Sequence, residues 1–420
     1  MKKVLIITYY WPPSGGAGVQ RWLKFVKYLP ETGWMPVVVT VDTRYATYPV
    51  TDESLYSDVP GEVEVIRTRA INYFTLYSKD PSKVPSGGFA SGPGKGIFGK
   101  ISRFIRGNFF IPDPRRGWNR FAFRSASEII MREGISHLIT TSPPHSTQLI
   151  GLRLKRRFPS LKWIADLRDP WTEIYYYGLF YPTLLSRYLD RTYEKRVLKN
   201  CDYITTVGWS LGEQFSSKVE GISDKIRVIP NGYDESDFQE VIPDPPQQFT
   251  ITFTGTLSDS YPLSGLVNAI MGISQQGYRP MLKFIGKVSE SLKKSITAGL
   301  DNEQAVFTDY LPHAGAVGEM VSASLLLLVI ADHPQNRTFL SGKLFEYIAS
   351  GTPILCLGPV DGDAARILLE NDSGRCFDYY DEAGIGKFII SQMSHAAPKR
   401  SGIPAHYSRR HLAGEIARLL

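Results

Sequence analysis

A glycine-rich loop near the beginning of the sequence is the first feature that could bind a ligand. It consists of Ser14-Gly15-Gly16-Ala17-Gly18 and joins an apolar run, residues 4–9, to a predicted helix. Glycines let a backbone approach a ligand closely, and the start of a helix favours negative charge. A dinucleotide fingerprint would need G-x-G-x-x-G directly after the strand, but Arg21 stands at the third glycine. The pattern therefore disfavours binding of a nicotinamide dinucleotide. Asp42 ends the second apolar run, where a ribose-binding acid would stand, and we interpret it as a strand-end residue.

Polar side chains also follow two later apolar runs, at the places where parallel sheets bind ligands. His145 lies in the loop after residues 137–141, and a neutral imidazole there could orient a hydroxyl group or position an acceptor. Asp166, Arg168 and Asp169 end the run that begins at residue 162. Asp169 could bind a ligand or act as a base, while Asp166 and Arg168 could simply pair with each other. The spacing does not decide which of the two acids matters.

The sequence predicts no required metal and no bound cofactor. Asp361-Gly362-Asp363 has a D-x-D pattern, but it precedes a predicted helix, residues 364–370, where aspartates are good caps. Cys201, Cys356 and Cys376 are far apart and form neither a disulfide framework nor a metal-ligand spacing. A reducing cytoplasm is therefore the expected environment.

The elements that position these residues alternate between buried strands and helices. Residues 4–9 and 35–41 are continuous apolar runs, as expected of strands covered on both faces. Residues 240–248 contain three prolines and are typical of a linker, and the alternation restarts after them. We therefore predict an α/β protein with two parallel-sheet domains, residues 1–239 and 249–404, and a binding site in a cleft between them.

The individual elements follow from apolar runs and from helical spacing. The predicted strands are residues 4–9, 35–41, 63–67, 137–141, 162–166, 203–207, 226–229, 250–254, 281–285, 305–307, 325–330 and 353–356. The predicted helices are residues 19–30, 119–133, 147–158, 184–199, 209–219, 263–276, 316–322, 342–349, 364–370 and an amphipathic tail, residues 405–420.

Five motifs along the chain together resemble family four glycosyltransferases. They are YYWPPSGGAGVQ at residues 9–20, PDPRRGW at 112–118, IADLRDPW at 164–171, IPNGYD at 229–234 and GKLFEYIASGTPI at 342–354. The motifs fall in the order of that family and span nearly the whole chain. The resemblance implies the GT-B fold, with two Rossmann-like domains facing each other across a cleft. It also implies transfer of a sugar from a nucleotide diphosphate sugar with retention of configuration. The final helix, residues 405–420, is expected to pack back on the first domain.

The resemblance implies that Glu346 accepts hydrogen bonds from the ribose hydroxyls of the donor, a role that suits a carboxylate. The backbone amides that open its helix, at Ser341 and Gly342, would face the diphosphate. The sequence departs from the family at Thr338, where the first acid of an E-x7-E pattern is expected.

A second departure concerns positive charge beside the diphosphate. Thr256 and Tyr261 stand where the family commonly has arginine and lysine after Gly255. Since a leaving diphosphate needs charge compensation, we hypothesise that Lys343 supplies it, with Arg337 as the second candidate. The implied donor-binding set is Gly16, Ala17, Gly255, Thr256, Arg337, Ser341, Gly342, Lys343, Leu344 and Glu346. The implied acceptor-binding set is Gly18, Asp166, Arg168 and Trp171, and the catalytic candidates are His145, Asp169 and Lys343.

Composition and charge limit the classes of partner that this protein can have. The 420 residues are 43% hydrophobic and carry 48 Lys and Arg against 41 Asp and Glu, which excludes a disordered or collagen-like chain. Residues 95–124 hold eight of the basic residues and one acid, interleaved with aromatics. This mixture suits a membrane surface with anionic headgroups, or else a solvated basic face over a buried apolar stripe.

We expect a cytoplasmic protein without a signal peptide or membrane span, in peripheral contact with the inner face of the cytoplasmic membrane. The expected partners are a nucleotide-sugar donor and a glycan or lipid-linked acceptor of cell-surface polysaccharide or lipopolysaccharide biosynthesis, and no nucleic acid. Two alternatives remain open at this point: a nucleotide-sugar epimerase of GT-B-like fold, and a non-catalytic partner protein with that fold.

Overall fold

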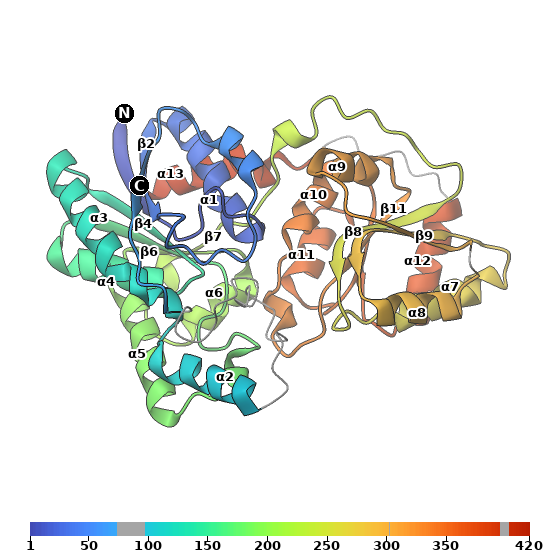
Figure 1. Cartoon of the computed structure of the whole chain (residues 1–420). Helices are drawn as coiled ribbons and strands as arrows, with labels where there is room; N and C mark the ends of the chain where they lie inside the picture. The colour runs from blue at the N-terminus through green and yellow to red at the C-terminus, as the bar shows by residue number, and fades with distance from the viewer. Residues whose placement is uncertain (74–96, 302, 395–402) are drawn as a thin grey trace. The chain divides into compact units, whose positions relative to one another are not determined.

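The computed structural model describes residues 1–73, 97–301, 303–394 and 403–420. The chain forms two compact units (Figure 1). Unit 1 consists of Met1–Pro230 and Arg409–Leu420, and unit 2 of Asn231–Ser408. Each unit is built on one parallel sheet, so the α/β class that the alternation of strands and helices predicts is confirmed.

The sheet of unit 1 has the order β3-β2-β1-β4-β5-β6-β7, and all its pairings are parallel. Its strands are β1 (Lys2–Ile7), β2 (Trp34–Val41), β3 (Glu64–Thr68), β4 (His137–Ser142), β5 (Lys162–Leu167), β6 (Tyr203–Thr206) and β7 (Ile226–Val228). The helices are α1 (Ala17–Tyr28), α2 (Ile97–Phe109), α3 (Asn119–Glu133), α4 (Ser146–Arg157), α5 (Leu184–Asn200), α6 (Trp209–Ser216) and α13 (Arg409–Leu419).

Both faces of this sheet are buried, which explains why β1 and β2 are continuous apolar runs. Leu5 and Ile7 of β1 belong to a core cluster with α3 and α4, whereas Val4 and Ile6 belong to a second cluster with α1 and α13. Successive side chains of a strand point to opposite faces, so every position of β1 between these helices needs an apolar residue. The final helix α13 packs against α1.

The sheet of unit 2 has the order β10-β9-β8-β11-β12-β13, again all parallel. Its strands are β8 (Thr250–Leu257), β9 (Met281–Val288), β10 (Ala305–Thr308), β11 (Leu325–Val329), β12 (Ile354–Leu357) and β13 (Gly374–Phe377). Figure 1 shows α9 (His313–Ser322), α10 (Gly342–Ser350) and α11 (Asp363–Glu370) on the opposite face of this sheet from α7 (Ser264–Ser274), α8 (Glu290–Gly299) and α12 (Glu382–Ser394).

Several elements differ from the prediction. The sequence does not predict α8, α12 or β13, and it indicates only a basic aromatic segment where α2 forms. Within the described residues, no helix combines the length and the apolarity needed to cross a bilayer.

Candidate functional site

A pocket in unit 2 brings together three of the candidate residues. It lies near the carboxyl ends of β8 and β9 and has a volume of about 160 Å³. Gly255, Lys343 and Glu346 are among its lining residues. The remaining lining residues come from β8, β9, α9 and the loop before α9, and they are Thr254, Ile285, Gly286, Tyr310, Leu311, His313, Ala316 and Met320. The pocket therefore combines an apolar wall with one cation and one carboxylate.

The Lys343 side chain reaches from α10 across the end of β8. Gly255 has φ +116°, and a Cβ built at this glycine would lie 2.1 Å from Lys343 Nζ. The ammonium also lies 4.6 Å from the centre of the Phe253 ring. The space that Lys343 occupies therefore exists because residue 255 has no side chain. In the part of the chain that the structure describes, no hydrogen bond reaches Lys343 Nζ.

Burial controls the charge of this lysine. Desolvation lowers the pKa of Lys343 to about 8, although the nearby Glu346 carboxylate acts in the opposite direction. The ammonium form is therefore poorly stabilised by the protein alone. An anionic ligand beside Nζ would stabilise the charged form and raise this pKa.

Helix α10 begins with a side-chain cap. Ser341 is the N-cap, and its Oγ accepts a hydrogen bond of 3.3 Å from the Lys343 amide. Glu346 follows one turn later and lines the same pocket as Lys343. Leu344 is fully buried, and its amide donates to the Ser341 carbonyl at 3.1 Å, so neither its side chain nor its amide is available to a donor.

Two further donor candidates, Arg337 and Thr256, and the two departures from the family pattern, Thr338 and Tyr261, lie outside the pocket lining. Arg337 forms an ion pair of 3.0 Å with Asp361, and both side chains are exposed. Thr338 donates a hydrogen bond to the Gln335 carbonyl. Thr256 is exposed on β8, and Tyr261 packs against the core. The pocket therefore contains a single one of the proposed diphosphate cations, Lys343.

The D-x-D segment does not act as the sequence predicts. The N-cap of α11 is Gly362, which has no capping side chain, and Asp363 is the buried first residue of the helix. The prediction that these aspartates cap the helix is therefore wrong. Among the described residues, no group of three His, Cys, Asp or Glu side chains is placed to hold a metal ion, and the dispensability of metal stays a prediction.

In unit 1, His145 and Trp171 form a stacked pair. Their ring centres are 4.8 Å apart with an interplanar angle of 13°. Trp171 is buried and donates a hydrogen bond of 2.7 Å from Nε1 to Asp190. Burial lowers the pKa of His145 to about 3, so this imidazole is neutral at physiological pH. Burial also raises the pKa of Asp190 to about 7, and the Trp171 hydrogen bond opposes this shift.

Asp166 lies inside unit 1 with no exposed surface. Its Oδ1 accepts hydrogen bonds from Arg21 and Thr205, and its Oδ2 accepts from Trp22 and Thr141. Burial alone would raise the pKa of Asp166, but Arg21, Arg168 and these hydrogen bonds hold it below its usual value. The Asp166 carboxylate is saturated by protein donors, so contact with an acceptor would require these bonds to break.

The neighbouring Arg168 and Asp169 differ from Asp166. Arg168 Nε donates to the Ser142 carbonyl at 2.9 Å and lies 4.0 Å from Asp166 Oδ2, as in the pairing alternative. Asp169 follows the end of β5 and is partly exposed. Burial raises the pKa of Asp169, an effect that Arg168 opposes. Of the two acids, Asp169 is the one that a ligand can reach.

The glycine loop is held by the segment that follows β2. The Gly15 amide donates to the Val50 carbonyl, and the Asp52 amide donates to the Pro13 carbonyl. Gly16 is the N-cap of α1 with φ +83°, and a Cβ there would contact nothing within 4 Å. A Cβ at Gly18 would lie 3.6 Å from the Tyr10 ring. These residues belong to unit 1, and a role of Gly16 and Ala17 in donor binding stays a prediction.

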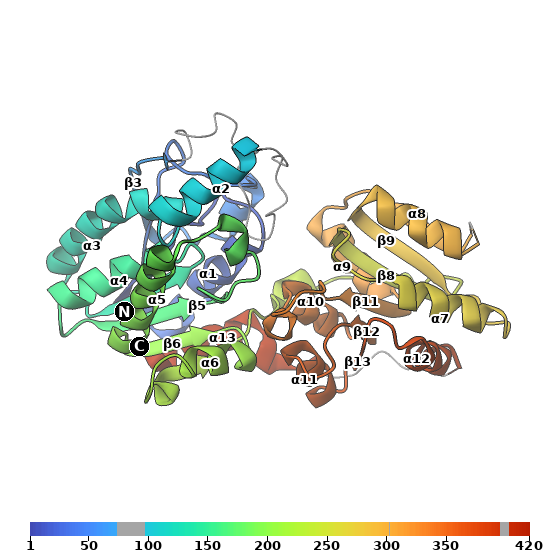
Figure 2. The same ribbon diagram turned by 90° about the horizontal axis from the view of Figure 1, so that it is seen from below.

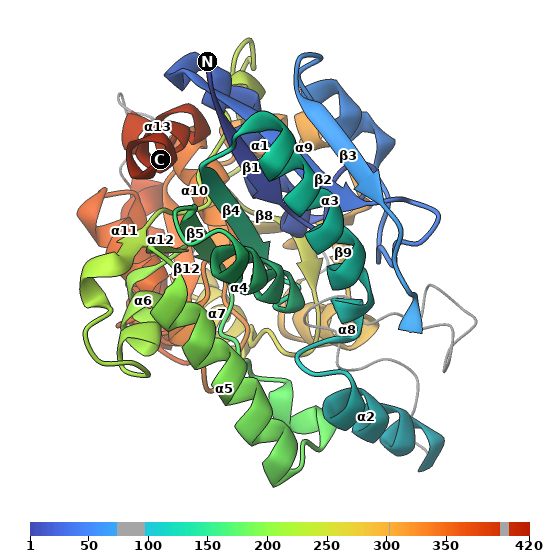
Figure 3. The same ribbon diagram turned by 90° about the vertical axis from the view of Figure 1, so that its left-hand side faces the viewer.

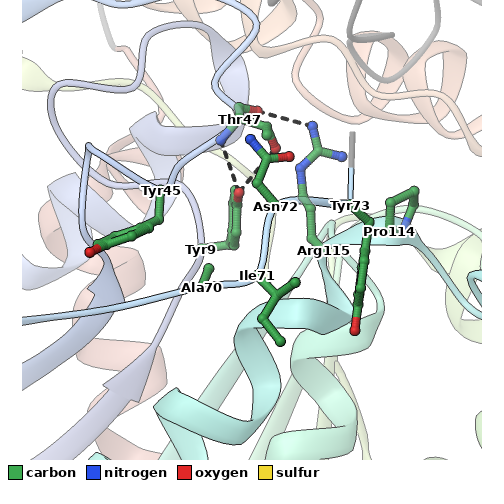
Figure 4. Close-up of a pocket in the computed structure, with 9 residues that line it drawn as sticks. All are labelled: Tyr9, Tyr45, Thr47, Ala70, Ile71, Asn72, Tyr73, Pro114 and Arg115. Atoms are coloured by element: carbon green, nitrogen blue, oxygen red, sulfur yellow. Dashed lines mark hydrogen bonds between the residues drawn. The ribbon is translucent and has the colours of Figure 1, made fainter. Parts of the chain in front are cut away.

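The structure also brings together residues that were not among the site candidates. Arg115 donates to the Thr47 carbonyl, and its guanidinium lies 5.5 and 5.4 Å from the centres of the Tyr9 and Tyr10 rings. The Thr47 amide donates to Tyr9 Oη, and Tyr9, Thr47 and Arg115 line a hollow of about 10 Å³ (Figure 4). That volume is about the minimum that one water molecule needs. The signal was present in the sequence, because Tyr9 and Arg115 belong to two of the five motifs.

Comparison with known proteins shows the fold. No protein-family model matches this sequence, and no curated protein matches it. The solved structures that are similar to it include a sucrose-phosphate synthase from Thermosynechococcus elongatus, which is 14% identical in sequence. The match covers 100% of this chain and 98% of the synthase chain, with a TM-score of 0.64. The chain has the GT-B fold.

Two further structures agree with this fold. The Anabaena protein HepE in complex with UDP is 12% identical, with coverage of 99% and 94% and a TM-score of 0.57. A Listeria monocytogenes protein assigned as a UDP-N-acetylglucosamine 2-epimerase is also 12% identical, with coverage of 99% and 95% and a TM-score of 0.54. Because this GT-B fold occurs in a synthase and in a protein assigned as an epimerase, the function must be argued from the site.

Proposed function

We propose that this protein is a glycosyltransferase that moves a sugar from a nucleotide diphosphate sugar to a hydroxyl group of its acceptor. The observation that carries the proposal is the position of Lys343. Its ammonium is mostly buried, lies against the bare backbone of Gly255, and shares a pocket with Glu346. A buried cation without a hydrogen-bonded anion is costly, and a diphosphate would remove that cost.

The pocket can bind the donor with a division of roles. Glu346 accepts hydrogen bonds from the ribose hydroxyls, and Lys343 with the amides that open α10 compensates the diphosphate charge. The apolar residues Leu311 and Met320 line the rest of the pocket and suit a nucleobase. Tyr310 is 82% exposed at the same pocket, so its ring is available to stack on that base.

Lys343 also stabilises the leaving group of the reaction. As the bond between sugar and diphosphate breaks, negative charge grows on the departing phosphate, and a fixed cation stabilises that state. The acceptor hydroxyl then passes its proton to the departing phosphate on the same face of the sugar, which retains the configuration. In unit 1, Asp169 and the neutral His145 are the candidates for orienting the acceptor.

The acceptor that we propose is a glycan or lipid-linked glycan of cell-surface polysaccharide or lipopolysaccharide biosynthesis, used in the cytoplasm. This part of the proposal depends on the resemblance of the five motifs. UDP is bound by HepE, and it is therefore the first nucleotide to test here, with GDP as the second.

Thermal unfolding with UDP, GDP, ADP or NAD tests the donor site. A nucleotide at 100 times its dissociation constant stabilises the folded state by about 2.7 kcal/mol. We expect a shift with UDP or GDP that is lost in Glu346→Gln and kept in Glu290→Gln, a matched change on α8 whose side chain is 79% exposed. No shift with any nucleotide would favour a non-catalytic protein with this fold.

The epimerase alternative predicts a different product. An epimerase would convert a nucleotide sugar without any acceptor, whereas a transferase needs one. Proton NMR of the protein with a UDP-sugar alone separates the two functions. We expect an unchanged sugar configuration, and a new epimer would reject the transferase.

A further inference from the structure

Helix α2 of unit 1 carries an apolar stripe that faces solvent. Ile97, Ile101 and Phe104 are spaced by four and three residues, which places them on one side of the helix. They are 75%, 49% and 42% exposed. A basic helix that covers a core would bury such a stripe. The alternative of a solvated basic face over a buried stripe therefore does not describe α2.

The beginning of α5 adds a second exposed apolar group. Leu184, Leu185 and Tyr188 are 86%, 67% and 68% exposed. Figures 2 and 3 both show α2 beside this end of α5. The six side chains named for the two helices are called the α2–α5 surface below.

Asn108 holds the two helices together. Its Nδ2 donates to the Tyr181 carbonyl at 3.0 Å. Its Oδ1 accepts hydrogen bonds from the Thr183 amide and the Ser186 hydroxyl, at 2.8 and 2.7 Å. Because Asn108 lies one turn after Phe104 on the same side of α2, these bonds place the stripe next to the start of α5.

The two segments that carry this surface contain basic residues and no acid. Residues 97–112 contain Lys100, Arg103 and Arg106 without any acid, and residues 175–189 contain Arg187 without any acid. Arg103 and Arg106 lie over the rings of Tyr181 and Phe180, at 5.9 and 3.8 Å. Cations and large apolar side chains are therefore interleaved along two segments that contain no acidic residue.

We propose that the α2–α5 surface docks unit 1 on a lipid bilayer that contains anionic lipids. Exposed apolar side chains beside basic ones match the boundary between acyl chains and anionic headgroups. In the docked state Ile101, Phe104 and Leu184 enter this boundary, while Lys100 and Arg187 stay among the headgroups. A bilayer fits better than a protein partner, because these apolar residues are exposed on two helices. They line neither the pocket at Lys343 nor the hollow at Tyr9.

Cosedimentation of the full chain with vesicles tests this docking. We expect binding to vesicles of phosphatidylglycerol and phosphatidylcholine in equal parts, and at least ten-fold weaker binding to pure phosphatidylcholine. High salt should weaken the first binding, because screening shortens the reach of the charges. Each of two double variants, Ile101→Ser with Phe104→Ser and Leu184→Ser with Leu185→Ser, should reduce binding at least ten-fold. Met131→Ser, at a residue of α3 that is 57% exposed, is the matched control and should bind like the wild type.

A second measurement reports insertion directly. Phe104→Trp should lose fluorescence on vesicles with brominated acyl chains, and Met131→Trp should not. Equal binding to both kinds of vesicle, full binding by both double variants, or no quenching of Phe104→Trp would overturn the proposal. None of these readouts needs a nucleotide or an acceptor, so their failure would leave the proposed transferase activity standing.

Discussion

Arg21 donates two hydrogen bonds, of 3.2 and 3.1 Å, to Oδ1 of Asp166 inside unit 1. The same guanidinium donates to the Pro230 carbonyl at 2.7 Å. Arg21 is the residue that stands where a dinucleotide fingerprint would have its third glycine. The buried pair therefore joins α1, which begins at the glycine loop, to β5, which precedes Asp169. It therefore fixes the start of α1 and the end of β5 relative to each other, and both border the candidate acceptor site.

Loss of Arg21 should destabilise the protein strongly. Arg21→Met leaves the Asp166 carboxylate buried beside its hydroxyl and indole donors but without the cation that is hydrogen-bonded to it, with Arg168 remaining 4.0 Å away. Breaking a buried pair costs about 3–5 kcal/mol. Chemical denaturation followed by circular dichroism measures this free energy of unfolding. Arg410→Met, which removes an exposed arginine, should change it by less than about 1 kcal/mol. A similar small change in Arg21→Met would show that Asp166 does not depend on the pair.

The same pair predicts a pH dependence of stability. The folded-state pKa of Asp166 lies below its ordinary value of 3.8, so the unfolded chain binds more protons at this residue as the pH falls. Its stabilising contribution is therefore complete above the ordinary pKa and is lost as the pH falls through the lowered one. The difference in unfolding free energy between the wild type and Asp166→Asn should shrink between pH 5 and pH 3. A constant difference over that range would contradict the prediction.

Gly255→Ala should expel Lys343 from its position. A Cβ at residue 255 would overlap Lys343 Nζ, and the positive φ adds backbone strain. We expect nucleotide binding to weaken at least ten-fold in isothermal titration calorimetry. In the background Lys343→Ala, where the overlap no longer exists, Gly255→Ala should cost much less. Gly272→Ala is the control, since a Cβ there meets nothing within 4 Å.

Most of the elements could be predicted because their signals are local. The helix Asn119–Glu133 has the predicted bounds, and β11 is a run of five buried residues with no polar interruption. The sequence does not predict helix α8, because its ten residues hold only two large apolar side chains, Leu292 and Ile296, and only Ile296 is buried. The helix begins at a Ser289 cap, which is a common feature of loops as well.

The candidate site was predictable only in part. Glu346 and Lys343 share one motif, so their proximity to each other follows from the sequence. The contact of Lys343 with Gly255, however, depends on how α10 packs on β8. No local sequence pattern predicts that packing. Asp166 is a stronger example, because its donors come from α1, β4 and β6. Long-range contacts of this kind, rather than residue type, make Asp166 an internal carboxylate and leave Asp169 accessible.

Binding of the nucleotide should depend on pH through Lys343. Its pKa of about 8 means that the cation is lost as the pH rises past that value, so the affinity for UDP or GDP should fall between pH 7 and pH 9.5. Lys343→Met should bind weakly and show no such fall. The stability follows the opposite trend, because between about pH 8 and its ordinary value of 10.5 the unfolded chain binds more protons at Lys343 than the folded one. An affinity that stays constant to pH 9.5 would remove Lys343 from the diphosphate site.

His145 should act as a neutral group that positions the acceptor. Since its pKa is about 3, the rate profile between pH 5 and pH 8 should contain no step from this residue. His145→Phe keeps the stack on Trp171 and should change the free energy of unfolding by less than about 1.5 kcal/mol, because an aromatic ring of similar size replaces it. The ring nitrogens are lost, however, and sugar transfer at saturating donor should fall at least ten-fold while nucleotide affinity stays unchanged. If transfer by His145→Phe equals that of the wild type, the imidazole serves only as a packing partner of Trp171, and Asp169 is left as the acceptor-side candidate.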